Sequence, residues 1–303
     1  MKVSVIMPVY NGKKYLFKYA IPSLIKQVYK NWEAIIIDDG SNDGVWLEIE
    51  KLCREDSRFR CFRFSENRGL GAALNFAIKH SIGEIITFLE QDDVWLSDKL
   101  SVQVEEIRHG RQYTNCFGLI YYPNKGGKFF GVKNNFSTLA FNRKLIERFL
   151  PFPEDPRITG VEDIWAIVYL SVNKQELSLN EKDFLYELYP LVIILYHDDS
   201  LSRSINFRRI AARYRALMNN FCPYCFRPEL ICHFKVWRRH LFFNRIAALI
   251  PRPIIIPFVK LYRHFDYKHK YKNSINFKEV VNKYPSRIQE AADFMKVIED
   301  SNK

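Results

Sequence analysis

Residues 83–95 read GEIITFLEQDDVW, an apolar run that ends abruptly in carboxylates. The part from Ile85 to Leu89 is rich in isoleucine and phenylalanine, which is typical of a buried strand. Glu90, Asp92 and Asp93 follow it, and carboxylates so close in sequence repel one another unless solvent or a hard cation screens them. The stretch therefore predicts a strand that delivers acidic side chains to one edge of a sheet, where they suit a divalent cation and a phosphate ligand.

A simpler interpretation of these acidic residues is structural. Acidic side chains after a strand often lie in a solvated turn, and Asp93 is placed to cap the helix expected from Ser97. The choice between the two interpretations depends on the rest of the N-terminal half.

The first 125 residues alternate between short apolar runs and segments with helical spacing. Apolar runs occupy 3–9, 34–37, 59–64 and 85–89, and helical spacing occurs at 13–28, 43–56, 69–80 and 97–109. This alternation predicts an α/β fold with a mostly parallel sheet and flanking helices. Strand-like segments over 117–142, a helix over 161–172 and a strand over 191–196 are expected next. After residue 203, arginine, tyrosine and phenylalanine interleave at helical spacing, which predicts a mainly helical C-terminal region.

Polar clusters follow the expected strands of the N-terminal half. They are Tyr10-Asn11, Asp38-Asp39, Asn67 and Asp92-Asp93, one after each successive strand. Because ligands of open α/β sheets bind outside the carboxyl ends of the strands, four such clusters in register favour a ligand that lies across the sheet edge.

The positive charge of the chain is unevenly placed. Residues 1–202 hold 25 lysines and arginines against 27 acidic residues, whereas residues 203–303 hold 21 against 7. This asymmetry predicts that the C-terminal part meets something anionic. The six cysteines are scattered, and the chain opens directly into strand-like sequence, so we expect a reduced, cytoplasmic setting.

The motifs together resemble those of family 2 glycosyltransferases, nucleotide-sugar-dependent enzymes with the fold called GT-A. No single motif is specific, but their order and spacing are, and they span residues 1 to about 203. They are VSVIMPVYNG (3–12), IIIDDGSNDG (35–44), ENRGLGAALN (66–75), GEIITFLEQDDVW (83–95), VEDIW (161–165) and HDDSLSR (197–203). We accordingly expect a catalytic domain at 1–203 and a basic helical region at 204–303.

The resemblance implies a nucleotide-binding role for several of the residues at the strand ends. Asp39 is expected to hydrogen-bond the nucleotide base, since a carboxylate accepts the imide N–H of uracil well; a turn with a helix cap is the alternative for this motif. The other residues assigned to the nucleotide sugar are Pro8, Tyr10, Asn11, Asn67, Gly69, Glu90, Gln91, Asp92 and Arg203. Tyr10 offers a ring for stacking, and a strand end with an Asn-Gly turn explains it equally well.

The resemblance also implies the metal and catalytic residues. Asp92 occupies the second aspartate of the family's Asp-x-Asp motif and is expected to bind Mn²⁺ or Mg²⁺ at the diphosphate, with His197 completing the site. A purely structural histidine after a buried strand is the alternative for His197. Glu90 departs from the usual aspartate by one methylene, which puts its direct contact with ligand in doubt. Asp163 is expected to act as general base for the acceptor hydroxyl; ordinary acidity at a helix N-terminus is its alternative.

Two features of the C-terminal region allow more than one interpretation. Residues 236–265 mix basic, aromatic and apolar side chains without a run long enough to span a bilayer, which favours a segment lying on an anionic membrane surface. A solvated helical subdomain is the alternative, and no nucleic-acid-binding module is recognisable. Cys222, Cys225 and Cys232 resemble half of a zinc site, although free cysteines are common.

The resemblance thus implies a metal-dependent inverting glycosyltransferase. It would transfer a sugar from a nucleotide diphosphate donor, UDP-linked by expectation, to a hydroxyl of a glycan or lipid-linked acceptor in the synthesis of a cell-surface polysaccharide or glycoconjugate. The alternatives are a non-catalytic sugar-nucleotide or glycan-binding relative, for which Glu90 is evidence, and a nucleotidyltransferase.

Overall fold

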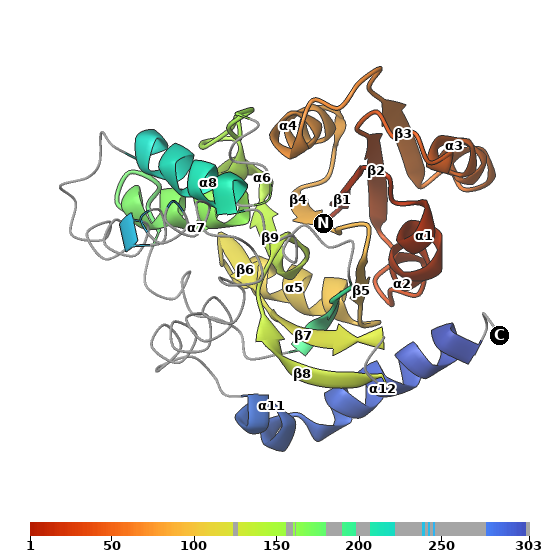
Figure 1. Cartoon of the computed structure of the whole chain (residues 1–303). Coiled ribbons are helices and arrows are strands. Elements are labelled where there is room, and N and C mark those ends of the chain that lie inside the picture. The colour runs from red at the N-terminus through yellow and green to blue at the C-terminus, as the bar shows by residue number, and fades with distance from the viewer. Residues whose placement is uncertain are drawn as a thin grey trace. The chain divides into compact units, whose positions relative to one another are not determined.

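The computed structural model confirms the predicted α/β fold with a mostly parallel central sheet (Figure 1). It describes residues 1–123, 127–155, 160, 162–179, 190–197, 207–221, 238–239, 242, 245 and 277–300. The chain forms two compact units. The first comprises residues 1–154, 174–197 and 277–303, and the second comprises 155–173 and 198–276.

A six-stranded sheet forms the centre of the first unit, with strand order β3-β2-β1-β4-β9-β6. The strands are β1 (Val3–Val9), β2 (Trp32–Asp38), β3 (Phe59–Arg63), β4 (Ile85–Phe88), β6 (Tyr113–Asn115) and β9 (Leu139–Asn142). The first four are parallel, as the alternation of strands and helices predicted, whereas β9 runs antiparallel to both β4 and β6. The carboxyl ends of β1 to β4 therefore meet at one edge of the sheet.

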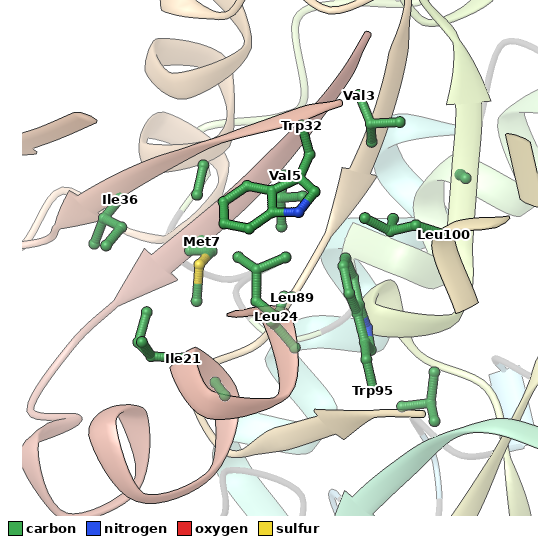
Figure 2. Packing of buried hydrophobic residues seen from close by; sticks show 14 of the residues in the cluster. Val3, Val5, Met7, Ile21, Leu24, Trp32, Ile36, Leu89, Trp95 and Leu100 are labelled. Carbon is green, nitrogen blue, oxygen red and sulfur yellow. The ribbon is translucent and has the colours of Figure 1, made fainter. Parts of the chain in front are cut away.

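The two-residue period of the strands explains the core. Odd-numbered residues of β1, such as Val5 and Met7, face the same side as Trp32 and Ile36 of β2, where Leu24 packs on them (Figure 2). Leu24 lies on α2 (Ile21–Ile25). The helix α4 (Leu70–His80) contacts β1 and β2 without belonging to that cluster, so it covers the opposite face.

The predicted helix at 13–28 is interrupted. It consists of α1 (Lys13–Tyr15), a π-helical turn (Leu16–Ala20) and α2. Pro22 at the start of α2 has no N–H to donate to the preceding turn, which fits a break at this point. The other expected helices appear as α3 (Val45–Glu55), α4 and α5 (Lys99–Arg108), each within two residues of its predicted bounds.

A second, four-stranded sheet of the first unit has the order β5-β10-β7-β8. Its strands are β5 (Asp93–Trp95), β7 (Phe117–Tyr122), β8 (Lys128–Lys133) and β10 (Pro190–Leu195). Residues 83–95 thus supply a strand to each sheet, with Glu90–Asp92 between the two strands. A short 3₁₀ turn (Phe136–Thr138) and α6 (Arg143–Ile146) flank β9.

The described C-terminal elements are helical. They are α7 (Glu162–Val172) and α8 (Phe207–Asn220) in the second unit, and α11 (Phe277–Lys283) and α12 (Pro285–Asp300) in the first. The predicted domain boundary at residue 203 stays a prediction, although α11 and α12 pack with the N-terminal unit. None of the helices in the described part of the chain is long and apolar enough to cross a membrane.

Candidate functional site

Asp92 and His197 lie together at the edge of the sheets although 105 residues separate them. His197 Nε2 is 2.9 Å from Asp92 Oδ2. The imidazole is 7% exposed and stacks on the ring of Tyr15, with centroids 4.0 Å apart. Asp92 follows β4 and His197 follows β10, so the two sheets together create this pair. The structure therefore unites the two residues to which the sequence assigned the metal.

The chemistry of this pair fits a divalent cation. In an octahedral site with bonds near 2.1 Å, adjacent ligand atoms lie about 3 Å apart, so two atoms at 2.9 Å are already spaced as neighbouring ligands. A carboxylate with an imidazole suits Mn²⁺, whereas Mg²⁺ prefers oxygen ligands alone. Among the described residues no group of three or more His, Cys, Asp or Glu side chains is arranged to hold an ion.

Glu90 and Asp93, the other two carboxylates of the acidic stretch, both bind Asn135. The amide Nδ2 of Asn135 donates to Glu90 Oε2 and, at 2.7 Å, to Asp93 Oδ2. Asp93 is buried as the first residue of β5, and the N-cap position of α5 is occupied by Asp98. The expectation that Asp93 caps the next helix is therefore wrong, because the chain forms a strand first.

Gln91 binds the loop that follows β1. Its Oε1 accepts the N–H of Tyr10 at 2.9 Å, and its Nε2 donates to the carbonyl of Tyr10 at 3.2 Å. A Cβ at Gly12 would lie 2.3 Å from Gln91 Oε1, so this close approach requires glycine. Tyr10 itself is 47% exposed. Pro8 lies on β1 two residues before it.

The loop after β1 also joins the loop after β2. The N–H of Asn11 donates to Ser41 Oγ at 2.9 Å, and Asn11 Oδ1 accepts the N–H of Asn42 at 3.0 Å. Asn11 adopts φ 50°, a left-handed conformation that asparagine tolerates better than most residues. The side chain predicted to bind nucleotide thus helps to hold these two loops together.

Asp39 binds the loop after β3. Its two oxygens accept the N–H groups of Arg68 and Gly69 at 2.7 and 3.0 Å. Burial raises the pKa of this carboxyl, although these two hydrogen bonds act in the opposite direction. Gly69 has φ 91°, which favours glycine, and Asn67 beside it is exposed. Each carboxylate oxygen has a second lone pair, so these two contacts leave room for a hydrogen bond from a nucleotide base. Base binding by Asp39 stays a prediction.

The predicted base belongs to the second unit. Asp163 is half-buried at the start of α7, where its Oδ1 accepts the N–H of Ile164 at 2.8 Å. Glu162 is 1% exposed, and its Oε2 accepts the N–H of Gly160 at 2.6 Å. Both carboxylates therefore accept a backbone N–H near the start of the helix, and the role of Asp163 as general base stays a prediction. Arg203 and the three cysteines at 222, 225 and 232 lie outside the described residues.

Asn135, Ser41 and Tyr15 are residues of the site that the sequence did not predict. They come from a 3₁₀ turn, a loop and a short helix, and each acts through a contact with a predicted residue. No motif marks Asn135, which is 42 and 45 residues away from its two partners.

Comparison with known proteins assigns the chain to a family. The model of the family described as glycosyl transferase family 2 matches residues 4–167, more than half of the chain. An uncharacterized glycosyltransferase of Rickettsia felis is 44% identical over 104 residues, which cover 34% of this chain and 17% of that protein. The glucosyltransferase WfgD of Escherichia coli is 36% identical over 102 residues, or 34% of this chain and 39% of that protein. WfgD is described as a UDP-Glc:α-D-GlcNAc-diphosphoundecaprenol β-1,3-glucosyltransferase.

These matches are local, whereas similar solved structures cover more of the chain. The matches span between 17% and 40% of the length of the curated relatives. The mannosyltransferase PcManGT of Pyrobaculum calidifontis, solved with GDP-Man and Mn²⁺, is 17% identical with a TM-score of 0.56, covering 96% of this chain and 86% of that one. TarS 1–349 of S. aureus, solved with UDP-GlcNAc, is 19% identical with a TM-score of 0.53, covering 72% and 67%. At these identities the two structures support the fold.

Proposed function

The chain belongs to glycosyl transferase family 2 and is a glycosyltransferase, and from this premise we propose that it moves a sugar from a nucleotide diphosphate donor to a hydroxyl of a glycan or lipid-linked acceptor. The observation that carries the proposal is the Asp92–His197 pair, which lies at the sheet edge beside the Gln91–Tyr10 contact. A UDP-linked donor and an acceptor on a lipid diphosphate are the chemistry named for WfgD. They are the first candidates to test here.

Four loops, which follow β1 to β4, carry predicted nucleotide residues and support a single binding surface. Hydrogen bonds join the loop after β4 to the loop after β1, and that loop to the loop after β2. Asp39 extends the series to the loop after β3. We therefore place the base near Asp39, with Tyr10 at the exposed rim available for stacking, and the diphosphate near Asp92.

Asp92 and His197 would hold the divalent cation, with Mn²⁺ favoured by the imidazole. When bound, the cation supplies positive charge that stabilises the departing diphosphate. Within the protein, His197 is kept in place by the ring of Tyr15, and Asp92 by the fixed loop on either side of it. Both ligands would thus be prepared before the donor arrives.

Asp163 would serve as the general base. The acceptor oxygen forms a bond to the anomeric carbon while the bond from that carbon to the diphosphate oxygen breaks. The hydroxyl proton passes to the Asp163 carboxylate, and the nucleoside diphosphate leaves with its electron pair. A single displacement of this kind inverts the configuration at the anomeric carbon.

The test is release of nucleoside diphosphate from a panel of nucleotide sugars, with and without acceptor. We expect acceptor-dependent release that Asp163→Asn reduces at least about a hundredfold, while the affinity for the nucleotide stays unchanged. Nucleotide binding without turnover on any donor and acceptor would favour a non-catalytic binding protein. Release of pyrophosphate would identify a nucleotidyltransferase.

We further propose that residues 204–303 bring the enzyme to an anionic membrane surface from the cytoplasmic side. The support is their excess of basic residues and the mixture of basic and aromatic side chains at 236–265. Co-sedimentation with vesicles containing phosphatidylglycerol should fall when the lysines and arginines of 236–265 are replaced by glutamine. Unchanged binding after that replacement would refute this membrane role.

A further inference from the structure

Asn135 is the residue on which the acidic stretch is organised. Its side-chain nitrogen carries two hydrogens, and the structure places one carboxylate on each, Glu90 and Asp93. These two residues flank Asp92 in the sequence on both sides. Of the three carboxylates, Asp92 is the one that points to His197. The Asn135 amide therefore binds Glu90 and Asp93, whereas Asp92 binds His197.

The turn that carries Asn135 is firmly anchored. Residues 136, 137 and 138 are buried, and Thr138 Oγ1 donates to the carbonyl of Asn135 at 2.6 Å. Ser137 Oγ accepts the N–H of Glu90 at 3.0 Å, and the carbonyl of Ser137 accepts the indole N–H of Trp95 at 3.1 Å. The turn thus binds the main chain at the start of the acidic stretch and a side chain at its end. A residue on such a support can impose a position on its partners.

We propose that Asn135 is a positioning residue that holds the Glu90 and Asp93 carboxylates out of the cation's coordination sphere, so that Asp92 and His197 are the described side chains that would hold the cation. This inference rests on the proposed function and deepens it, because it assigns the choice of cation to a residue that contacts neither cation nor donor. Glu90, which departs from the aspartate of the family motif, thus has a contact of its own, because its carboxylate is one of the two that bind the amide.

The consequence is a preference among cations. With Glu90 bound to Asn135, the described residues at this position offer one carboxylate and one imidazole, a set that favours Mn²⁺ over harder cations. If Glu90 is released, a second carboxylate enters and the set becomes richer in oxygen and in negative charge. Such a set favours Ca²⁺, which takes more oxygen ligands in more flexible arrangements. Loss of the amide should therefore change selectivity as well as affinity.

The experiment is calorimetric titration of UDP into the full-length protein in excess Mn²⁺ and, separately, in excess Ca²⁺. The quantity compared is the ratio of the two dissociation constants. We expect Asn135→Ala to shift this ratio toward Ca²⁺ by at least about fivefold. Asn134→Ala, the same substitution at the half-buried neighbouring position, should leave the ratio within about twofold of the unmodified protein.

A second variant protein distinguishes a positioning role of Asn135 from a general loss of packing around the site. In a protein that already carries Glu90→Ala and Asp93→Ala, there is no released carboxylate, so Asn135→Ala should have no further effect on the ratio. An equal loss of affinity in both cations, or the same effect in both backgrounds, would overturn the inference. Wild-type protein that binds UDP equally well with and without cation would refute the metal-dependent mechanism itself. An unchanged ratio in a catalytically competent Asn135→Ala protein would refute the positioning role alone.

Discussion

Gln91 binds Tyr10 through both groups of its side-chain amide, one accepting the N–H at 2.9 Å and the other donating to the carbonyl at 3.2 Å. The contact joins the loop predicted to hold the base to the loop that carries Asp92. Because an amide both donates and accepts, neither a carboxylate nor an aliphatic side chain can replace it. Gln91 thus connects the loop after β1 with the loop after β4, the two loops expected to bind the base and the diphosphate.

Replacement of Gln91 by glutamate should weaken donor binding. The carboxylate cannot donate to the Tyr10 carbonyl and adds negative charge beside the proposed diphosphate position. We expect the Kd for the nucleotide to rise about tenfold, the equivalent of one lost hydrogen bond with some repulsion. Calorimetric titration measures it. Equal affinity in the two proteins would show that the contact does not prepare the site.

Gly12→Ala should reproduce part of this effect without touching Gln91 itself. The new Cβ would meet Gln91 Oε1 at 2.3 Å, so the amide must move away from Tyr10. We expect nucleotide affinity to fall several-fold with a destabilisation of about 1 kcal/mol. Gly131→Ala is the matched control, because its Cβ would meet Ile120 at an ordinary 3.5 Å. Combined with Gln91→Glu, Gly12→Ala should add little, which distinguishes this route from an independent defect.

The alternating pattern of the first 125 residues was sufficient to predict the parallel part of the fold. Each strand there is a short apolar run, each crossover is a helix, and parallel topology then brings the polar strand ends to one edge. This is why Asp39 and Asp92 could be singled out from sequence. The pairing of β9 with β4 could not be, because antiparallel pairing across 50 residues leaves no periodic trace.

The partners of the predicted residues were beyond the reach of the sequence for a related reason. Asn135 and Ser41 are small polar residues in turns, where such residues are common whatever they contact. Tyr15, on which His197 stacks, is the last residue of α1, directly before the π-helical turn that interrupts the expected helix at 13–28. Functional residues at strand ends can be recognised in a sequence, whereas the long-range contacts that position them are seen only in the folded structure.

Lys99 should make the stability of the first unit depend on pH. It is fully buried, with Nζ 2.6 Å from Thr87 Oγ1 and 3.5 Å from the centroid of the Trp95 ring. Burial lowers the pKa of Lys99 to about 7, whereas an unfolded lysine titrates near pH 10.4. Above pH 7 the unfolded chain therefore holds the extra proton. The free energy of unfolding should rise by about 1 kcal/mol between pH 7 and 8.

Lys99→Met should abolish this rise and stabilise the protein by about 1–3 kcal/mol at pH 6.5, where the native state otherwise buries a charge. Thr87 keeps its own hydrogen bond to the carbonyl of Leu139. Urea unfolding at pH 6 to 8 measures both effects. The pH series should end at pH 8, because burial raises the pKa of Cys116 to about 12. Thiols of the unfolded chain ionise near pH 8.5, so at higher pH this second group lowers the free energy of unfolding. Lys79→Met, at an exposed position, should leave the pH dependence intact.

Helix α12 should be required for the stability of the first unit. Ala291 and Met295 are 0% and 1% exposed, the ammonium of Lys26 lies 4.6 Å from the centroid of the Phe294 ring, and Arg287 forms an ion pair with Asp98. The helix therefore buries an apolar face against the N-terminal elements. Removal of residues 277–303 should expose the surface of the N-terminal elements that this helix covers. The unfolding transition of the remaining protein should then broaden, or its midpoint should fall.

Substitutions within α12 test this without removing the helix. Met295→Ala should destabilise the protein by about 2–4 kcal/mol, because it leaves a cavity in packed surroundings. Val297→Ala, at a side chain 58% exposed on the same helix, should cost less than about 0.5 kcal/mol. Urea unfolding followed by tryptophan fluorescence reports on both, since Trp32 and Trp95 lie in the core of the first unit. Equal small effects would mean that α12 contributes little to the stability of the first unit.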